Sequence, residues 1–295
     1  MMQKEFKGII TALITPFDAD GNLDESGLRI LLRRQVECGV HGVAVVAGSG
    51  EFVNLTDAER RRVVEISAEE VSGRIPVIMG ILSPDTASAV AWGKEAEGLG
   101  ADALLLLSPY YNKPSVPGLI NHFRSVAEAT DLPIIAYNNP GRTGINLTSN
   151  LPELAEIPGI VGVKECNREL AILSQTIATL GDKLDVLSGE DDLLYPSFEL
   201  GVKGGILTTS NVAPSHWVRM YNAIVEGDHA TARAIHYEML PFINAVYVLN
   251  HPASVKKALS IIGLPAGLTR APLASPTPEQ EKRINDLILS MGLTA

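Results

Sequence analysis

The sequence predicts an α/β protein built as a TIM (β/α)8 barrel with a C-terminal extension of three helices. Eight short apolar runs are typical of strands buried on both faces, and a stretch with helical patterning follows each run. The runs begin about 20 to 35 residues apart, which is close to the size of a βα unit. They occupy residues 9–15, 43–46, 76–80, 103–107, 134–138, 160–164, 184–188 and 205–208.

Local signals mark where helices begin and end. Thr56, followed by Glu59, and Asp85 are helix-start signals after the second and third runs. Gly39, Gly100 and Gly201 each stand between a helical stretch and the next run, where glycine permits the left-handed turn that ends a helix. The repeat of this arrangement favours successive βα units.

Strands cease after the eighth run, and the remaining chain has helical patterning. We expect helices over residues 228–249, 252–263 and 277–291. The barrel is therefore expected over residues 1–227 and the helical extension over residues 228–295. No flexible linker separates the two parts.

A doubly wound fold is the alternative architecture. Gly48-Ser49-Gly50 follows the second run, as the start of a dinucleotide-binding fingerprint would. Val53 stands where the third glycine of that fingerprint belongs. Eight βα units fit a closed barrel better.

Composition restricts the function. Of 295 residues, 46% are hydrophobic, which suffices for a large core, and the net charge is −10. That charge disfavours nucleic-acid binding through a general basic surface. The N-terminus lacks an apolar signal region, and no apolar stretch approaches the roughly 18 residues of a membrane span. We expect a cytoplasmic protein with no membrane partner.

Metal chemistry and cofactors are not expected. The two cysteines, Cys38 and Cys166, have no metal-binding spacing, and the six histidines are scattered away from the strand ends. No phosphate-binding loop and no nucleophile elbow are present.

The chemistry of a (β/α)8 barrel lies at the carboxyl ends of its strands. Lys164 ends the sixth run. Burial there disfavours the charged form of lysine, and a neutral amine can form a Schiff base with a ketone or aldehyde. The alternative is a lysine whose ammonium extends to water.

Other strand ends carry residues with two interpretations. Tyr137 is either a core tyrosine or an acid/base, and Arg142 is either a solvated loop cation or a partner for a carboxylate. Ser49 either forms only a turn or helps to hold an oxyanion. Tyr110 and Tyr111 could pack against another subunit.

At these residues the chain resembles the dihydrodipicolinate synthase/N-acetylneuraminate lyase family of class I (Schiff-base) aldolases. The resemblance covers nearly all of residues 6–295. Its most specific segments are SPYYNKPS (108–115), YNNPGRTG (137–144), GVKE (162–165) and LSGED (187–191). It implies a pyruvate-dependent lyase or synthase without a cofactor, assembled as a homotetramer of two tight dimers.

The resemblance also implies three catalytic residues. Lys164 corresponds to the lysine that forms an imine with pyruvate or another 2-keto acid. Tyr137 corresponds to the tyrosine that moves protons at the imine and enamine. Tyr111 corresponds to a tyrosine that reaches across the tight-dimer interface into the neighbouring site.

Five residues are implied to bind substrate. Ser49 and the adjacent amides, with Gly48, correspond to the binders of the keto acid's carboxylate. Arg142 corresponds to the arginine that holds the carboxylate of a second, aldehyde substrate. Gly189 and the carbonyl of Ile206 match positions that line the pocket.

Two departures from the family pattern bear on the reaction. Gly48 stands where the family carries a hydroxyl that relays protons between two tyrosines. Pro84 and Ser88 replace the asparagine and glutamate of a lysine-feedback site, so we predict no inhibition by lysine. The rim after the third run, with Ile81 and Leu82, is more apolar than in the family.

Three functions remain open. The first joins pyruvate to aspartate semialdehyde, and Arg142 favours it. The second cleaves or dehydrates a 2-keto-3-deoxy sugar acid or N-acetylneuraminate, and Gly48 favours it. The third is a binding or regulatory barrel without turnover, which the pairing of Lys164 with Tyr137 disfavours.

Overall fold

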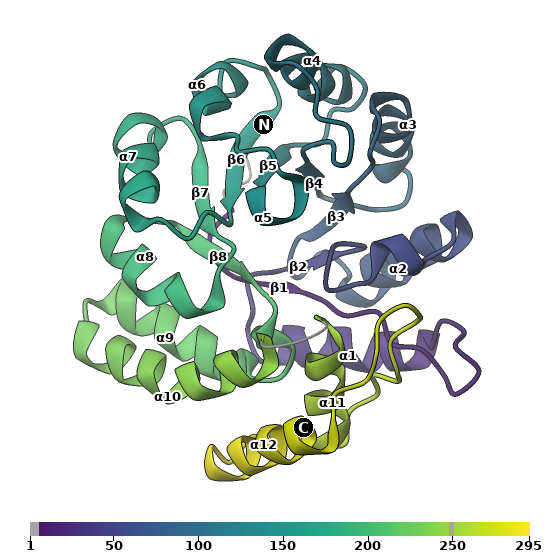
Figure 1. Cartoon of the computed structure of the whole chain (residues 1–295), viewed down its shortest axis with the longest axis vertical. Helices are drawn as coiled ribbons and strands as arrows, with labels where there is room; N and C mark the ends of the chain where they lie inside the picture. Colours follow the sequence, from purple (N-terminus) through teal and green to yellow (C-terminus); the bar gives the residue numbers. More distant parts are fainter. Residues whose placement is uncertain (1–5, 248–250) are drawn as a thin grey trace.

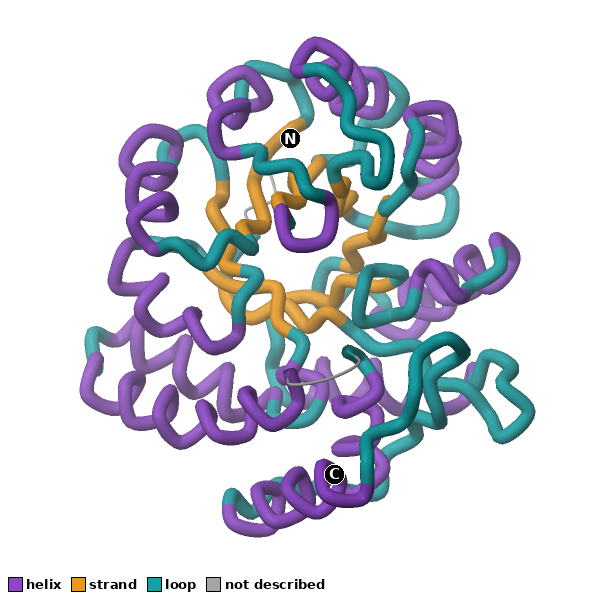
Figure 2. Tube along the Cα trace, viewed as in Figure 1, coloured by secondary structure: helices purple, strands orange, loops and turns teal. Residues whose placement is uncertain are grey.

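The computed structural model describes residues 6–247 and 251–295, and it forms a closed barrel of eight parallel strands (Figures 1 and 2). Each strand pairs with the next, and β8 pairs with β1 to close the ring. The predicted TIM barrel is confirmed. The strands are β1 (Gly8–Ala12), β2 (Gly42–Val45), β3 (Val77–Ile81), β4 (Ala103–Leu107), β5 (Ile134–Asn138), β6 (Ile160–Glu165), β7 (Asp185–Ser188) and β8 (Gly204–Leu207).

Every strand residue is buried, which explains the continuous apolar runs. One set of side chains, including Ile10, Ile78, Leu105 and Ile135, fills the barrel interior. The alternate set packs against the surrounding helices. Because the interior is a packed core, open space for chemistry lies only at the end of the barrel.

Helices form an outer ring around the strands, as Figure 2 shows. The predicted helix starts are confirmed, because Thr56 caps α2 through a capping box and Asp85 caps α3. The ring consists of α1 (Glu25–Glu37), α2 (Asp57–Val71), α3 (Thr86–Ala96), α4 (Val116–Ala127), α6 (Leu151–Leu154), α7 (Leu170–Leu180), α8 (Leu194–Leu200) and α9 (Pro214–Glu226).

The connection after β5 differs from the other units. A single turn, α5 (Pro140–Thr143), follows the strand directly and is drawn in front of the barrel opening in Figure 1. A proline after Asn139 favours this immediate helix start, because proline suits the first turn of a helix. The turn carries Arg142 into the loops at the barrel mouth.

The expected three helices of the extension are present as α10 (His229–Tyr247), α11 (Ala253–Ile261) and α12 (Pro278–Ser290). The first was expected to reach residue 249, and residues 248–249 lie outside the described residues. Buried side chains of the extension, such as Phe242, Leu259 and Ile284, belong to the same hydrophobic core as the outer faces of the strands. In the described part of the chain, no helix is long and apolar enough to cross a membrane.

Candidate active site

A cavity of about 480 Å³ opens at the carboxyl ends of the strands. Six of the eight site residues expected from the sequence line it together: Gly48, Ser49, Tyr137, Arg142, Lys164 and Gly189. The described chain surrounds them with apolar side chains that include Phe52, Leu82 and Leu107. A concave, mainly apolar site with a few converging polar groups is typical of small-molecule binding.

Lys164 and Tyr137 lie side by side inside the barrel. They are partners in the register of β5 and β6, so their side chains project from neighbouring strands toward the same face. The Lys164 Nζ lies 4.4 Å from the centre of the Tyr137 ring. Their exposed fractions are 6% and 8%, so the amine points into the cavity and not into bulk solvent.

The charge state of Lys164 differs from the expectation based on burial alone. Burial acts to lower the pKa of the ammonium, but the oxygen of Tyr137, the sulfur of Cys166 and the Asp191 carboxylate around it favour the charged form, and that pKa lies above its usual value. The amine is therefore protonated in the free protein and must lose a proton before it can act as a nucleophile. The prediction of a lowered pKa from burial was wrong, because burial accounts only for the loss of solvent and not for the groups that surround the amine.

Tyr137 is held as a neutral phenol. Burial raises the pKa of its hydroxyl above the usual value, and the neighbouring Lys164 only partly opposes this. The Asn139 Nδ2 donates a hydrogen bond of 3.0 Å to the phenol oxygen. The hydroxyl hydrogen remains available for transfer toward the amine or a bound substrate.

Gly189 gives Lys164 its space. A Cβ atom built at Gly189 would lie 2.1 Å from the Cys166 Sγ and 2.8 Å from the Lys164 Cε. Both distances are far below van der Waals contact, so only glycine allows these two side chains to pack here. Burial raises the pKa of Cys166 to about 12, so its thiol is neutral beside the amine.

The loop that carries Gly48 and Ser49 is held from the C-terminal extension. Glu51 at its end has a left-handed backbone, with φ of 54°. Its buried carboxylate pairs with the Lys256 ammonium at 2.6 Å and accepts a hydrogen bond from the Arg270 backbone N–H. These contacts fix a strained backbone at the cavity wall.

Gly48 leaves free space where a side chain could stand. A Cβ built at this position would meet no atom within 4 Å. The backbone there is not left-handed, so glycine is not required for conformation. The wall of the cavity therefore lacks a side chain at the position that the family pattern assigns to a relay hydroxyl.

Arg142 presents an available cation at the cavity mouth. Its side chain is exposed, and the described residues offer its guanidinium no hydrogen bond or ion pair. A guanidinium in this state can accept a carboxylate through two parallel hydrogen bonds.

Two expected residues do not line this cavity. Tyr111 is 93% exposed and has a left-handed backbone with φ of 69°, so its ring projects outward from the chain. Ile206 is buried in the barrel interior, and Thr208, two residues further on, lines the cavity instead.

Residues 5–290 match the Dihydrodipicolinate synthetase family. The chain belongs to this family. It is 43% identical over 289 residues to 4-hydroxy-tetrahydrodipicolinate synthase of Pelobacter propionicus, which covers 98% of this chain and 99% of the relative. Dihydrodipicolinate synthase of Aquifex aeolicus is 36% identical, with a TM-score of 0.94 over 98% of this chain and 99% of that one. The enzyme of Acinetobacter baumannii, solved with pyruvate, is 33% identical, with a TM-score of 0.94 over 97% and 99%.

Sequence reasoning missed two residues that this family member brings into its site from the extension. Tyr247 ends α10 and His251 precedes α11, and both line the cavity. The His251 Nε2 lies 3.1 Å from the Ser49 Oγ, and the Tyr247 hydroxyl donates to the Asp191 Oδ1 at 2.9 Å. The last described strand, β8, ends at Leu207, far from these residues in the sequence, so the rule that places chemistry at strand ends could not find them.

The described residues hold no group of three His, Cys, Asp or Glu side chains that could bind a metal ion. Glu190, a further carboxylate on the cavity wall, forms an ion pair with Arg168.

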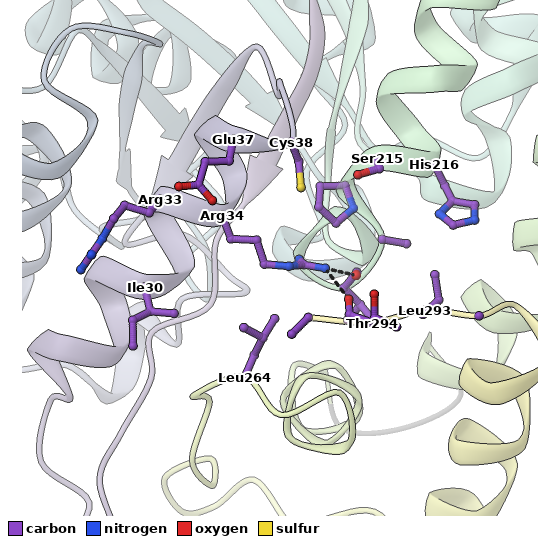
Figure 3. Close-up of a pocket in the computed structure, with 15 residues that line it drawn as sticks. Ile30, Arg33, Arg34, Glu37, Cys38, Ser215, His216, Leu264, Leu293 and Thr294 are labelled. Carbon is purple, nitrogen blue, oxygen red and sulfur yellow. Dashed lines mark hydrogen bonds between the residues drawn. The ribbon is translucent and has the colours of Figure 1, made fainter.

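A second cavity, of about 510 Å³, lies between α1, the start of α9 and the C-terminal residues (Figure 3). Its half-buried cation, Arg34, donates hydrogen bonds to the backbone carbonyls of Asn211, Val212 and Thr294. The guanidinium is therefore occupied in joining the C-terminus to the barrel. This cavity lacks the lysine and tyrosine of the first one and is not the candidate site.

Proposed function

We propose that the chain condenses pyruvate with aspartate semialdehyde through an imine on Lys164, as the named activity of its relatives, 4-hydroxy-tetrahydrodipicolinate synthase, suggests. The observation that carries the proposal is the buried Lys164 amine beside the Tyr137 phenol in a cavity whose mouth holds Arg142, a cation to which the described residues offer no ion pair. Two cations in one cavity of an acidic protein suit two substrates that each carry a carboxylate.

The first stage forms the imine. The neutral Lys164 amine attacks the keto carbon, and loss of water leaves a protonated imine. Tyr137 is placed to donate a proton to the departing hydroxyl and to take it back later. Because the pKa of Lys164 is raised, we expect imine formation to accelerate with pH as the neutral amine becomes more abundant.

The second stage forms the new bond. The protonated imine withdraws electrons, so the methyl group of pyruvate loses a proton to the Tyr137 oxygen, which gave up its hydrogen in the first stage, and an enamine results. The enamine carbon attacks the aldehyde carbon, which restores the protonated imine, and Tyr137 returns the proton to the new alkoxide. Water or the substrate's own amine then adds to the imine carbon, and the product leaves with release of the Lys164 amine. Arg142 holds the carboxylate of the aldehyde substrate at the mouth, and Ser49 with its neighbouring amides holds the carboxylate of pyruvate.

A second candidate function keeps the imine and changes the substrate. The free space at Gly48 favours cleavage or dehydration of a bulkier 2-keto-3-deoxy sugar acid or of N-acetylneuraminate. Assays with pyruvate plus aspartate semialdehyde, in parallel with these acids, separate the two reactions. Turnover of none of them, with no imine, would favour the binding barrel.

The assembly is also part of the proposal. We infer a homotetramer made of two tight dimers, in which Tyr111 of one subunit enters the site of its neighbour. The exposure of this aromatic ring and its strained backbone support the inference, because a monomer gains nothing from either. Sedimentation of the wild type and of Tyr111→Asp tests it: the variant should dissociate and lose activity together.

Borohydride reduction in the presence of pyruvate tests the imine, with peptide mass mapping to locate the adduct. We expect the adduct on Lys164 and none in Lys164→Ala. The chain offers an internal control, because burial lowers the pKa of Lys256 to about 8, which makes it neutral more often than Lys164. An adduct on Lys256, or none at all, would contradict the proposal.

A further inference from the structure

His251 reaches the candidate site from the C-terminal extension and contacts the residue proposed to bind the keto acid's carboxylate. Its Nε2 lies 3.1 Å from the Ser49 Oγ, and its ring stacks parallel to Tyr247 with ring centres 5.7 Å apart. The same Ser49 oxygen lies 3.0 Å from the Thr208 Oγ1. Ser49 is therefore held between an imidazole and a second hydroxyl.

The other nitrogen of His251 decides which way the first hydrogen bond points. Nδ1 is buried and has no hydrogen-bond partner among the described residues. A buried N–H without an acceptor is rare and costly, and an acceptor without a donor is tolerated better. The proton of the neutral imidazole therefore belongs on Nε2, which donates to the Ser49 oxygen.

The ring is neutral for a physical reason. Burial, together with the positive charges of Arg142 and Lys164, lowers the pKa of His251 to about 4. A charged ring would place a second proton on the buried Nδ1, where the described residues offer it no acceptor. At neutral pH His251 is therefore a fixed donor through Nε2.

Asp191 anchors the other side of this polar cluster. The hydroxyl of Tyr247, whose ring stacks on His251, donates to the Asp191 carboxylate at 2.9 Å. The backbone N–H groups of Thr208 and Thr209 also donate to the Asp191 carboxylate, so its position is fixed and it acts as a hydrogen-bond acceptor. Because the His251 N–H occupies the Ser49 oxygen, the Ser49 hydroxyl donates to the Thr208 Oγ1.

We propose that His251 is a positioning residue that keeps the Ser49 hydroxyl as a hydrogen-bond donor for the carboxylate of the keto acid. The inference rests on the proposed function, in which Ser49 binds that carboxylate. The imidazole N–H donates to the oxygen of Ser49, so the hydroxyl hydrogen of Ser49 must donate to a different acceptor. When the carboxylate binds, the hydrogen of the Ser49 hydroxyl turns from Thr208 to the carboxylate, while the imidazole N–H stays on the Ser49 oxygen.

Without His251, the direction of the hydrogen bond between Ser49 and Thr208 is no longer fixed. Thr208 could then donate to Ser49, and binding of the anion would require both hydroxyls to reorient. The expected consequence is weaker binding of the keto acid, with little change in the chemistry that follows. The effect should disappear when Ser49 has no hydroxyl to orient.

The test compares His251→Leu, which lacks the N–H, with His251→Asn, whose amide can still donate. We expect His251→Leu to raise the KM for pyruvate about 5- to 10-fold and to change kcat and the KM for the aldehyde less than about twofold. His251→Asn should recover most of the loss. His122→Asn is the matched control, because His122 also bonds a hydroxyl, that of Thr86, and also has a buried nitrogen without a partner, but it lies away from the cavity.

A double-mutant cycle provides the second readout and does not require His251→Leu to fold. Adding His251→Asn or His251→Leu to Ser49→Ala should change the KM for pyruvate no further. An unchanged KM in His251→Leu, or full additivity with Ser49→Ala, would overturn the inference while pyruvate trapping on wild-type Lys164 still supports the proposed function. Absence of trapping in the wild type would overturn both.

Discussion

Replacement of Gly189 by alanine should displace the nucleophile without removing any polar group from the site. The new Cβ would lie 2.1 Å from the Cys166 Sγ and 2.8 Å from the Lys164 Cε. To restore contact at about 3.4 Å, the sulfur must retreat by about 1.3 Å and the lysine carbon by about 0.6 Å. Cys166 and Lys164 are both buried and both line the cavity, so each must shift toward the open space, and the amine is displaced from its place beside Tyr137.

The expected result is a loss of about 10²-fold in kcat, because a misplacement of about 1 Å at a reacting group has a cost of that size. The rate of borohydride trapping at saturating pyruvate should fall in parallel. Overpacking should also lower the free energy of unfolding by about 1–3 kcal/mol. Stopped-time trapping with mass detection, steady-state kinetics and denaturant unfolding measure the three effects.

Two further variants isolate the cause. Gly48→Ala also adds a methyl group to the cavity wall, but its Cβ meets nothing within 4 Å, so trapping should stay within about twofold of the wild type. Cys166→Ala removes the larger overlap and should restore part of the activity of Gly189→Ala. If Gly189→Ala traps pyruvate as fast as the wild type, the close packing around Lys164 does not control its position.

Three other predictions follow from the site and its surroundings. Arg142→Gln should raise the KM for an acidic aldehyde by about 10-fold or more, because a charge-assisted pair is lost, and should leave pyruvate trapping unchanged; equal kinetics with both enzymes would refute its role. Burial lowers the pKa of His122 to about 4, so the unfolded chain binds a proton that the folded chain does not as pH falls below 6.5. This histidine should therefore destabilise the fold by about 2 kcal/mol near pH 5 relative to pH 7, and denaturant unfolding of His122→Asn should show a smaller loss between the two pH values. Pro84 and Ser88 predict that lysine does not inhibit, and micromolar inhibition in a steady-state assay would contradict this.

The barrel fold, and the placement of Lys164 and Tyr137 in its site, could be predicted from the local pattern of apolar residues in the sequence. Strands buried on both faces give unbroken apolar runs, and parallel strands place their carboxyl ends together, so Lys164 and Tyr137 could be assigned to one end of the barrel before their register was known. The register then set them on adjacent strands with the amine 4.4 Å from the ring. The charge state of Lys164 was not accessible, because it depends on groups such as Asp191 that only the folded chain brings near.

An apolar run recurs in every βα unit, and glycine and helix-cap signals mark several of the helix ends, so these patterns suffice to specify the closed barrel and the face on which its chemistry lies. Contacts between distant segments follow no such period. The approach of His251 to Ser49, the pairing of Lys256 with Glu51 and the space that Gly189 leaves for Lys164 each depend on packing across the whole barrel. Tertiary structure alone decided them, because a side chain's neighbours are set by the path of the folded chain and not by the residues beside it in sequence.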